Sequence, residues 1–224
     1  MNRMTFLARI RAAVDVANAT PKRLANSLGE RLAKPPHHPL PICAKVPRAE
    51  REAQFIRKLE ARGAVVLAVP ELSTLPEAVA PFVGGDTGPL LLGDDARLTS
   101  LPWTVPTQIW NPEQKPEDGT AALTHAQAAI AETGTLLFGS GAASPATLAF
   151  LAETHIAAVA RSTIFGSLED AFADLASRAP DRFPRAVNLI SSPSRTGDIG
   201  GRIVEGAHGP RTLVVVLYGA PADA

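Results

Sequence analysis

Three polar segments contain the side chains of this 224-residue chain that could bind a ligand or transfer a proton. The first, Glu132-Thr133-Gly134-Thr135, combines a carboxylate with two hydroxyl groups and the backbone N–H groups of a glycine turn. Spacing alone slightly favours the alternative of a tight turn whose hydroxyl groups bond to its own backbone. The second, residues 139–144, is a glycine-rich loop. It lacks the GxGxxG and GxxxxGKS/T spacings of nucleotide-binding loops, so we interpret it as a connection between elements.

The third segment, residues 192–209, allows two interpretations. Arg195 could grip a carboxylate or phosphate with two parallel hydrogen bonds, and His208 adds an imidazole, the side-chain type that changes charge near neutral pH. Alternatively, Ser194 or Thr196 caps a helical turn and Asp198 pairs with Arg195 or Arg202. A hydrolytic triad is not predicted, because no G-x-S-x-G turn surrounds the serine.

Two further histidines lie in or near predicted strands. His125 stands seven residues before Glu132 and could face the same site. His155 begins an apolar run, and we expect its ring to be satisfied by neighbours at the end of a strand.

Composition excludes several classes of function. The chain has one cysteine, Cys43, and 22 basic side chains against 22 acidic ones. A single cysteine cannot support a disulfide scaffold, a cysteine-rich zinc site or an iron–sulfur cluster on this chain, since such a cluster takes about four thiolates. We predict no metal site. We also predict no nucleic-acid binding, because no aromatic residues on which bases could stack accompany the basic residues. The apolar runs fall far short of the roughly 20 residues of a membrane span, and charges interrupt any secretion signal, so we expect a cytoplasmic protein.

The first 34 residues form a candidate helical arm. Phe6, Ile10 and Val14 recur at helical spacing, which predicts an amphipathic helix over residues 3–18. The arm carries seven Lys or Arg against two Asp or Glu. Four prolines within residues 35–41 exclude helix and central strand there. We therefore predict an arm over 1–34 and one main domain over 35–224.

The main domain alternates helices with short apolar runs. Helices are predicted over residues 48–62, 77–82 and 168–178, the last capped by Ser167. Strands are predicted over 64–69, 89–93, 136–138, 155–160, 186–190 and 212–218. Apolar runs without polar alternation, separated by helices, are typical of a mostly parallel open sheet flanked by helices. The polar segments lie at the ends of predicted strands, the usual place for ligands in α/β folds.

Three motifs resemble one known family. Residues 129–136, 193–199 and 205–210, the last followed by an apolar strand, are similar to the short LUD domain of the lactate utilization protein C family, and the resemblance spans residues 120–218. It implies an α/β fold of the NagB/RpiA/CoA-transferase-like kind. It also implies a role in oxidising L-lactate to pyruvate with partner subunits that carry iron–sulfur clusters. Ser192 and Gly200 depart from the family pattern, which usually has glycine and an acidic residue there.

The resemblance and the residues together suggest a pocket for a small anionic ligand. Glu132, Asp198 and His208 are the candidate catalytic residues. Candidate ligand contacts are Thr133, Gly134, Thr135, Ser194, Arg195, Thr196 and Gly209. One alternative is an acyl or CoA transferase with Glu132 as nucleophile, by analogy of fold. Another is a non-catalytic structural or regulatory subunit that docks through the N-terminal helix. Neither a cofactor nor an enzymatic activity is assigned.

Overall fold

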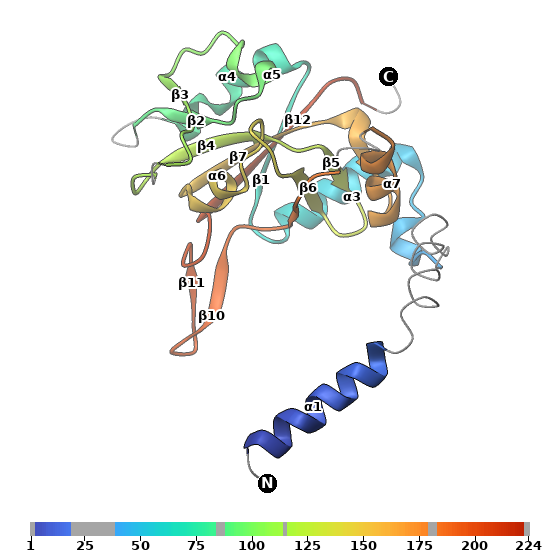
Figure 1. Ribbon diagram of the computed structural model, residues 1–224. Coiled ribbons are helices and arrows are strands. Elements are labelled where there is room, and N and C mark those ends of the chain that lie inside the picture. Colours follow the sequence, from blue (N-terminus) through green and yellow to red (C-terminus); the bar gives the residue numbers. More distant parts are fainter. Residues whose placement is uncertain (1–2, 19–38, 84–87, 114–115, 179–182, 222–224) are drawn as a thin grey trace. The chain divides into compact units, whose positions relative to one another are not determined.

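The computed structural model describes residues 3–18, 39–83, 88–113, 116–178 and 183–221. It divides into two units, Met1–Leu40 and Pro41–Ala224. The first contains helix α1 (Arg3–Asn18; Figure 1), so the helix predicted over residues 3–18 is present. Its Phe6, Ile10 and Val14 are exposed. The predicted boundary after residue 34 lies outside the described residues and stays a prediction.

The second unit is built on a six-stranded parallel sheet, as the sequence predicted (Figure 1). Its strands lie in the order β1-β12-β7-β4-β2-β3, and every neighbouring pair is parallel. The strands are β1 (Val65–Val69), β2 (Leu90–Leu92), β3 (Thr107–Ile109), β4 (Ala121–His125), β7 (Thr154–Ala160) and β12 (Thr212–Tyr218). The strands predicted over 64–69, 89–93, 155–160 and 212–218 are therefore confirmed.

Both faces of this sheet are covered, which explains why β12 has no polar alternation. On one face, Val215 packs with Phe55 and Leu59 of α3 (Arg48–Glu60). On the other, Val214 and Val216 pack with the short helices α4 (Leu75–Val79) and α5 (Ala96–Thr99). The helix predicted over 77–82 is divided between α4 and the 3-10 turn Ala80–Phe82.

A second, four-stranded sheet lies on the α3 side of the main sheet. Its order is β8-β5-β6-β9, with β6 antiparallel to both β5 and β9. Its strands are β5 (Ala128–Ile130), β6 (Thr135–Gly139), β8 (Ile164–Phe165) and β9 (Val187–Ile190). The strands predicted over 136–138 and 186–190 are thus present, but they belong to this second, mixed sheet, in which β5 and β8 are parallel. Helix α7 (Leu168–Arg178) covers its far face, and Ser167 caps that helix as predicted, since the Asp170 N–H donates to Ser167 Oγ at 3.0 Å.

Residues 195–205 form an antiparallel hairpin that extends away from both sheets (Figure 1). Its strands are β10 (Arg195–Ile199) and β11 (Arg202–Glu205). The hairpin is closed by Gly200 and Gly201, whose φ angles of 60° and 71° suit a two-residue turn that glycine adopts readily. The alternative of a capped helical turn at Ser194 or Thr196 is therefore wrong, because Thr196 lies in a strand.

The remaining short elements connect these layers. They are α6 (Ala146–Leu151) and the 3-10 turns Ile42–Ala44, Leu72–Thr74 and Arg161–Thr163. Within the described ranges, no helix is long and apolar enough to cross a membrane.

Candidate functional site

A cavity of about 390 Å³ lies between the edge of the second sheet and the amino ends of β7 and β12. Four residues singled out by the sequence, Ser194, Arg195, His208 and Gly209, line it. The structure thus brings the two ends of the third polar segment, which flank the hairpin, to one place.

Backbone hydrogen bonds hold these two ends together. The Ser194 N–H donates to the Pro210 carbonyl at 2.8 Å, and the Gly206 N–H donates to the Ser194 carbonyl at 2.9 Å. Gly209 packs so closely that a Cβ at this position would lie 3.2 Å from the Ser194 Cβ. The wall of the cavity beside Ser194 is therefore set by main-chain contacts as well as by side chains.

Arg195 is the cation of this cavity. Its Nε lies 3.3 Å from Glu205 Oε1 across the hairpin, and about half of each side chain is exposed. Arg195 therefore pairs with Glu205, whereas the sequence suggested that Asp198 pairs with Arg195 or Arg202. Its Nη2 atom reaches the turn after α3, where a Cβ on Gly63 would lie 2.6 Å away. Gly63 has φ 88° and leaves that space to the guanidinium.

The first polar segment reaches the cavity indirectly. Thr135 Oγ1 donates to Thr133 Oγ1 at 2.8 Å and lies 2.8 Å from Ser191 Oγ, and Ser191 lines the cavity. Because the Thr135 hydroxyl has one proton, Ser191 must be the donor in the second bond. Gly134, at φ 62°, forms the turn against Lys58 of α3.

Glu132 is buried and does not line this cavity. Its Oε1 accepts the Leu168 N–H at 2.8 Å at the first turn of α7. A carboxylate in this position satisfies a free amide and interacts favourably with the positive end of the helix dipole. The structure therefore gives Glu132 a role in holding α7 against the second sheet.

The topology of the second sheet explains which segments meet. Since β6 is antiparallel to β5 and β9, the turn after β5 and the chain after β9 lie at the same edge. The glycine-rich loop after β6 lies at the other edge, where the Ser140 N–H donates to the Ala186 carbonyl at 2.9 Å. That loop therefore lies at the opposite end of β6 from the cavity, in agreement with its interpretation as a connection between elements.

Two predicted site residues, Thr196 and Asp198, lie in the strand β10 of the hairpin. Thr196 pairs with Val204 across the hairpin. Asp198 lies in β10, but its side chain is outside the described part of the structure, so its role stays a prediction.

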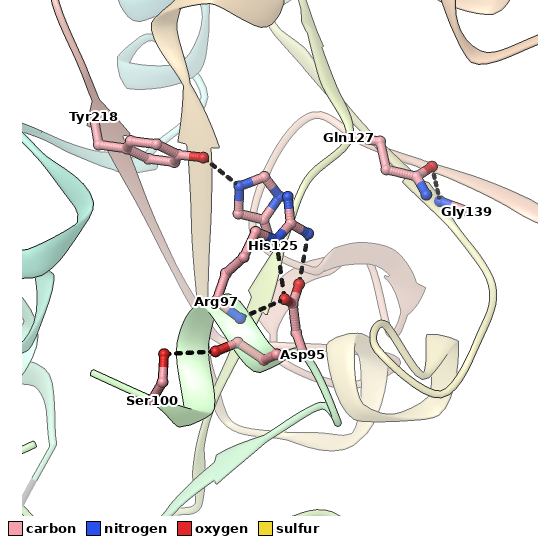
Figure 2. A network of polar contacts seen from close by, with 8 residues as sticks. Asp95, Arg97, Ser100, His125, Gln127, Gly139 and Tyr218 are labelled. Atoms are coloured by element: carbon pink, nitrogen blue, oxygen red, sulfur yellow. Dashed lines mark hydrogen bonds and ion pairs between the residues drawn. The ribbon is translucent and has the colours of Figure 1, made fainter. Parts of the chain in front are cut away.

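His125 does not join the cavity. It ends β4, and its Nε2 lies 2.7 Å from the hydroxyl of Tyr218, which ends β12 (Figure 2). Burial, assisted by the charge of Arg97, lowers the pKa of His125 to about 4. Burial alone would raise the pKa of Asp95, but hydrogen bonds from Arg97 hold it below its usual value. His125 therefore faces Tyr218 at the carboxyl end of the main sheet, near the Asp95 and Arg97 pair, and not the Glu132 region as the sequence suggested.

His155 also lines the cavity, a position that the sequence did not predict for it. It is completely buried near the start of β7, it lines the cavity, and its Nε2 lies 2.8 Å from Thr124 Oγ1. Burial lowers its pKa to about 4, so the ring is neutral at pH 7. Its Nδ1 is buried and has no hydrogen-bond partner among the described residues. The sequence predicted hydrogen-bond partners for this ring, but only Nε2 has one among the described residues.

A second cavity of about 620 Å³ adjoins the first and shares Phe150, His208 and Gly209 with it. It is lined by the acidic residues Glu117, Asp118, Glu153 and Glu205. His208 thus lies between the second cavity, which is lined by acidic residues, and the Arg195 cavity. Among the described residues, no three His, Cys, Asp or Glu side chains are arranged to hold a metal ion.

Removing the Glu132 carboxylate should destabilise the fold without changing the shape of the cavity. We expect Glu132→Ala to lower the free energy of unfolding by about 1–2 kcal/mol, because the Leu168 N–H loses its partner. Glu132→Gln keeps an acceptor oxygen and should lose less. Urea unfolding measures both changes, and equal losses in the two variants would contradict the capping role.

Acid should also destabilise the protein. The pKa values of His125 and His155 are both lowered from 6.5 to about 4 in the folded state. Below about pH 6.5 the unfolded chain binds protons that the folded chain does not, so the free energy of unfolding should fall between about pH 6.5 and about pH 4. His125→Gln should make this fall less steep. Urea unfolding across the range measures it, and constant stability down to about pH 4 would refute the buried neutral histidines.

Known proteins resemble this chain in sequence and in fold. The LUD domain family model matches residues 105–218, which include all three motifs of the sequence resemblance. A lactate utilization protein C from Geobacillus sp. (strain WCH70) is 32% identical over 169 residues, 67% of this chain and 69% of the relative. A lactate utilization protein C from Exiguobacterium sp. (strain ATCC BAA-1283 / AT1b) is 26% identical over 213 residues, 88% of this chain and 93% of the relative.

A solved structure supports the same assignment of fold. The crystal structure of a DUF162 family protein from Deinococcus radiodurans superposes with a TM-score of 0.60 at 23% identity, covering 78% of this chain and 99% of that one. The family model alone matches half of the chain, and the motifs that it contains line the cavity or contact a lining residue. This chain belongs to the LUD domain family.

Proposed function

We propose that this protein takes part in the use of lactate, and that the cavity beside Arg195 binds a small carboxylate. Relatives that carry the name lactate utilization protein C support the first part. The observation that carries the second is the convergence of Ser194, Arg195 and His208 on one cavity from segments fourteen residues apart. Its volume, about 390 Å³, is within the range of roughly 300–1,000 Å³ of small-molecule pockets.

Arg195 would supply the charge for this carboxylate. Its Nε faces Glu205, and its planar guanidinium has further N–H groups on the Nη atoms, which suit the two oxygens of a carboxylate. The Ser194 hydroxyl and the His208 ring would add donors from the two walls of the cavity. Glu205 balances the charge of Arg195, so a monoanion would be matched better than a more highly charged ligand.

Partner subunits would complete the pathway. The sequence has one cysteine, exposed Cys43, and an iron–sulfur cluster takes about four thiolates. Clusters used for electron transfer would therefore sit on another chain. The exposed apolar residues of α1, which include Met4, Phe6 and Ile10, are suited to docking such a partner.

The alternative of an acyl transferase with Glu132 as nucleophile has less support. The carboxylate of Glu132 is buried, and one of its oxygens accepts the Leu168 N–H. A nucleophile needs access to the acyl group, and Glu132 does not line the Arg195 cavity.

Replacing Arg195 should weaken carboxylate binding. We expect Arg195→Ala to raise the Kd for lactate or pyruvate by about tenfold to a hundredfold, since a hydrogen bond to a charged group contributes about 1.5–3 kcal/mol. Arg202→Ala is the matched control, because Arg202 is exposed on the same hairpin and does not line the cavity. Isothermal titration calorimetry measures both, and an unchanged Kd in Arg195→Ala would overturn the proposed site.

Growth tests the physiological part. A strain that lacks this gene and has no second copy should fail to grow on L-lactate as sole carbon source and should grow on pyruvate. The wild-type gene should restore growth on lactate, whereas a gene with Arg195→Ala should restore it poorly. Normal growth of the deletion strain on lactate would refute the proposed role.

A further inference from the structure

The hairpin β10–β11 stands apart from the rest of its unit. It extends away from both sheets, and within the described residues its two strands pair only with each other (Figure 1). A Cβ placed on Gly197, Gly200 or Gly201 would meet no atom within 4 Å beyond its chain neighbours, so the space around these positions is open. An isolated two-stranded hairpin is marginally stable in water, and its unpaired edges are a template for another chain.

The tip of this hairpin, residues 200–203, carries one apolar and one cationic side chain. Ile203 is 76% exposed, so most of its apolar surface is in contact with water. Arg202, the residue after the glycine turn, is exposed as well. Because successive residues of a strand point to opposite faces, these two side chains point in opposite directions. The tip is therefore a wedge with an isoleucine on one face and an arginine on the other.

The base of the same hairpin borders an exposed apolar surface. Glu205, which ends β11, lines the second cavity of about 620 Å³ together with two large apolar residues of α6. These are Phe150, which is 40% exposed, and Leu151, which is 50% exposed. Within one cavity, α6 thus forms an apolar wall that would gain by covering it.

The same cavity also has an acidic wall. Glu117 and Asp118, in the segment before β4, line it, and both are exposed. Neither forms an ion pair with a described residue, whereas Glu153 and Glu205 are paired with arginines. The cavity at the hairpin base therefore offers an apolar wall and an acidic wall, which match the two faces of the hairpin tip.

We propose that two copies of this chain form a dimer in which the hairpin tip of each copy enters the second cavity of the other. The chain's own geometry allows this exchange to be symmetric. When two identical hairpins lie side by side in opposite directions about a two-fold axis, each tip reaches the base of the other, whatever their length. The two contacts are then identical, as in the closed two-fold dimers that are the commonest oligomers of soluble proteins.

The two walls have different roles in this dimer. Ile203 packs on the apolar wall, and the loss of exposed apolar surface drives the association. Arg202 pairs with the acidic wall, and this charge pair sets the direction, since two tips placed together would bring like charges into contact. His208 lines both cavities, so the partner copy borders the Arg195 cavity as well.

Sedimentation equilibrium of the wild-type chain measures the first consequence. We expect a dimer of twice the 23.5 kDa chain mass. Its association should weaken as the salt concentration rises, because the charge pairs are near the surface. No ligand at Arg195 is required, so this result does not depend on the proposed carboxylate site. A chain that stays monomeric at millimolar concentration would overturn the proposal.

A matched pair of substitutions locates the apolar contact. Ile203→Ser should raise the Kd of the dimer by about tenfold or more, because it removes the side chain that packs on α6. Ile42→Ser is the control, since Ile42 is 89% exposed and lies outside both the hairpin and the cavity, and it should leave the Kd unchanged. An Ile203→Ser dimer as tight as the wild-type dimer would show that the hairpin tip is not buried in the interface.

Charge reversal gives the decisive test. In Arg202→Glu the tip meets a cavity of its own charge, and in a double variant with Glu117→Lys and Asp118→Lys the cavity repels the unaltered tip. Each variant alone should dimerise about tenfold or more weakly than the wild-type chain. A mixture of the two should form a heterodimer with an affinity close to that of the wild-type dimer. In it, the altered tip faces the altered cavity and the unaltered tip faces the unaltered cavity.

The heterodimer also serves as the control for folding, because only folded chains can restore the contact. Sedimentation of the mixture, with one variant carrying a fluorescent label, separates the heterodimer from the two monomers. Weak homodimers that recover on mixing are the expected result. A wild-type dimer whose two charge variants do not recover on mixing would place the interface elsewhere and overturn the exchange of hairpins.

Discussion

The antiparallel pairing of β6 with β9 determines where the candidate site lies. Leu136 is opposite Ile190 and Gly139 is opposite Val187, so the chain after β9 returns to the edge at which β6 begins. That edge already holds the turn after β5, and the bond between Thr135 and Ser191 joins the two. The hairpin, Arg195 and the segment with His208 all continue from this point. A shift in the β6–β9 register would separate Ser191 from Thr135 and move the wall of the cavity.

The two buried histidines occupy different positions along the parallel strands and have different roles. His125 ends β4, and Tyr218 meets it across the small residues Ala158 and Ala160 of β7. The hydrogen bond to Tyr218 helps to hold the end of β12, a strand whose residues pack into the core on both faces of the main sheet. His155 lies near the start of β7, where the second sheet covers it, and only there does a buried imidazole line the cavity. Burial keeps both rings neutral at pH 7, so neither would attract the proposed carboxylate by charge, and the account assigns that part to Arg195.

The sequence predicted those elements whose signals are local. The apolar, β-branched run of β12 and the Ser167 cap of α7 were identified because they depend on adjacent residues. The alanine-rich strand β4 was missed because it lacks the β-branched and aromatic residues typical of strands. The hairpin was missed because its strands are short and exposed, without alternating apolar residues. For the site, the chemistry of Arg195 suggested a candidate ligand contact, and that assignment stays a prediction. The position of His155 at the cavity could not be predicted, since its partner Thr124 and the cavity itself come from distant strands.

A crystal structure of the full chain grown with pyruvate tests the central claim, a carboxylate site beside Arg195, most directly. The account predicts the carboxylate within roughly 2.7–3.2 Å of the Arg195 guanidinium nitrogens, in the cavity closed by the segment of His208. Pyruvate bound elsewhere, for example at the His125 and Tyr218 network, would contradict it. So would an empty cavity at a concentration of pyruvate that saturates the protein in solution.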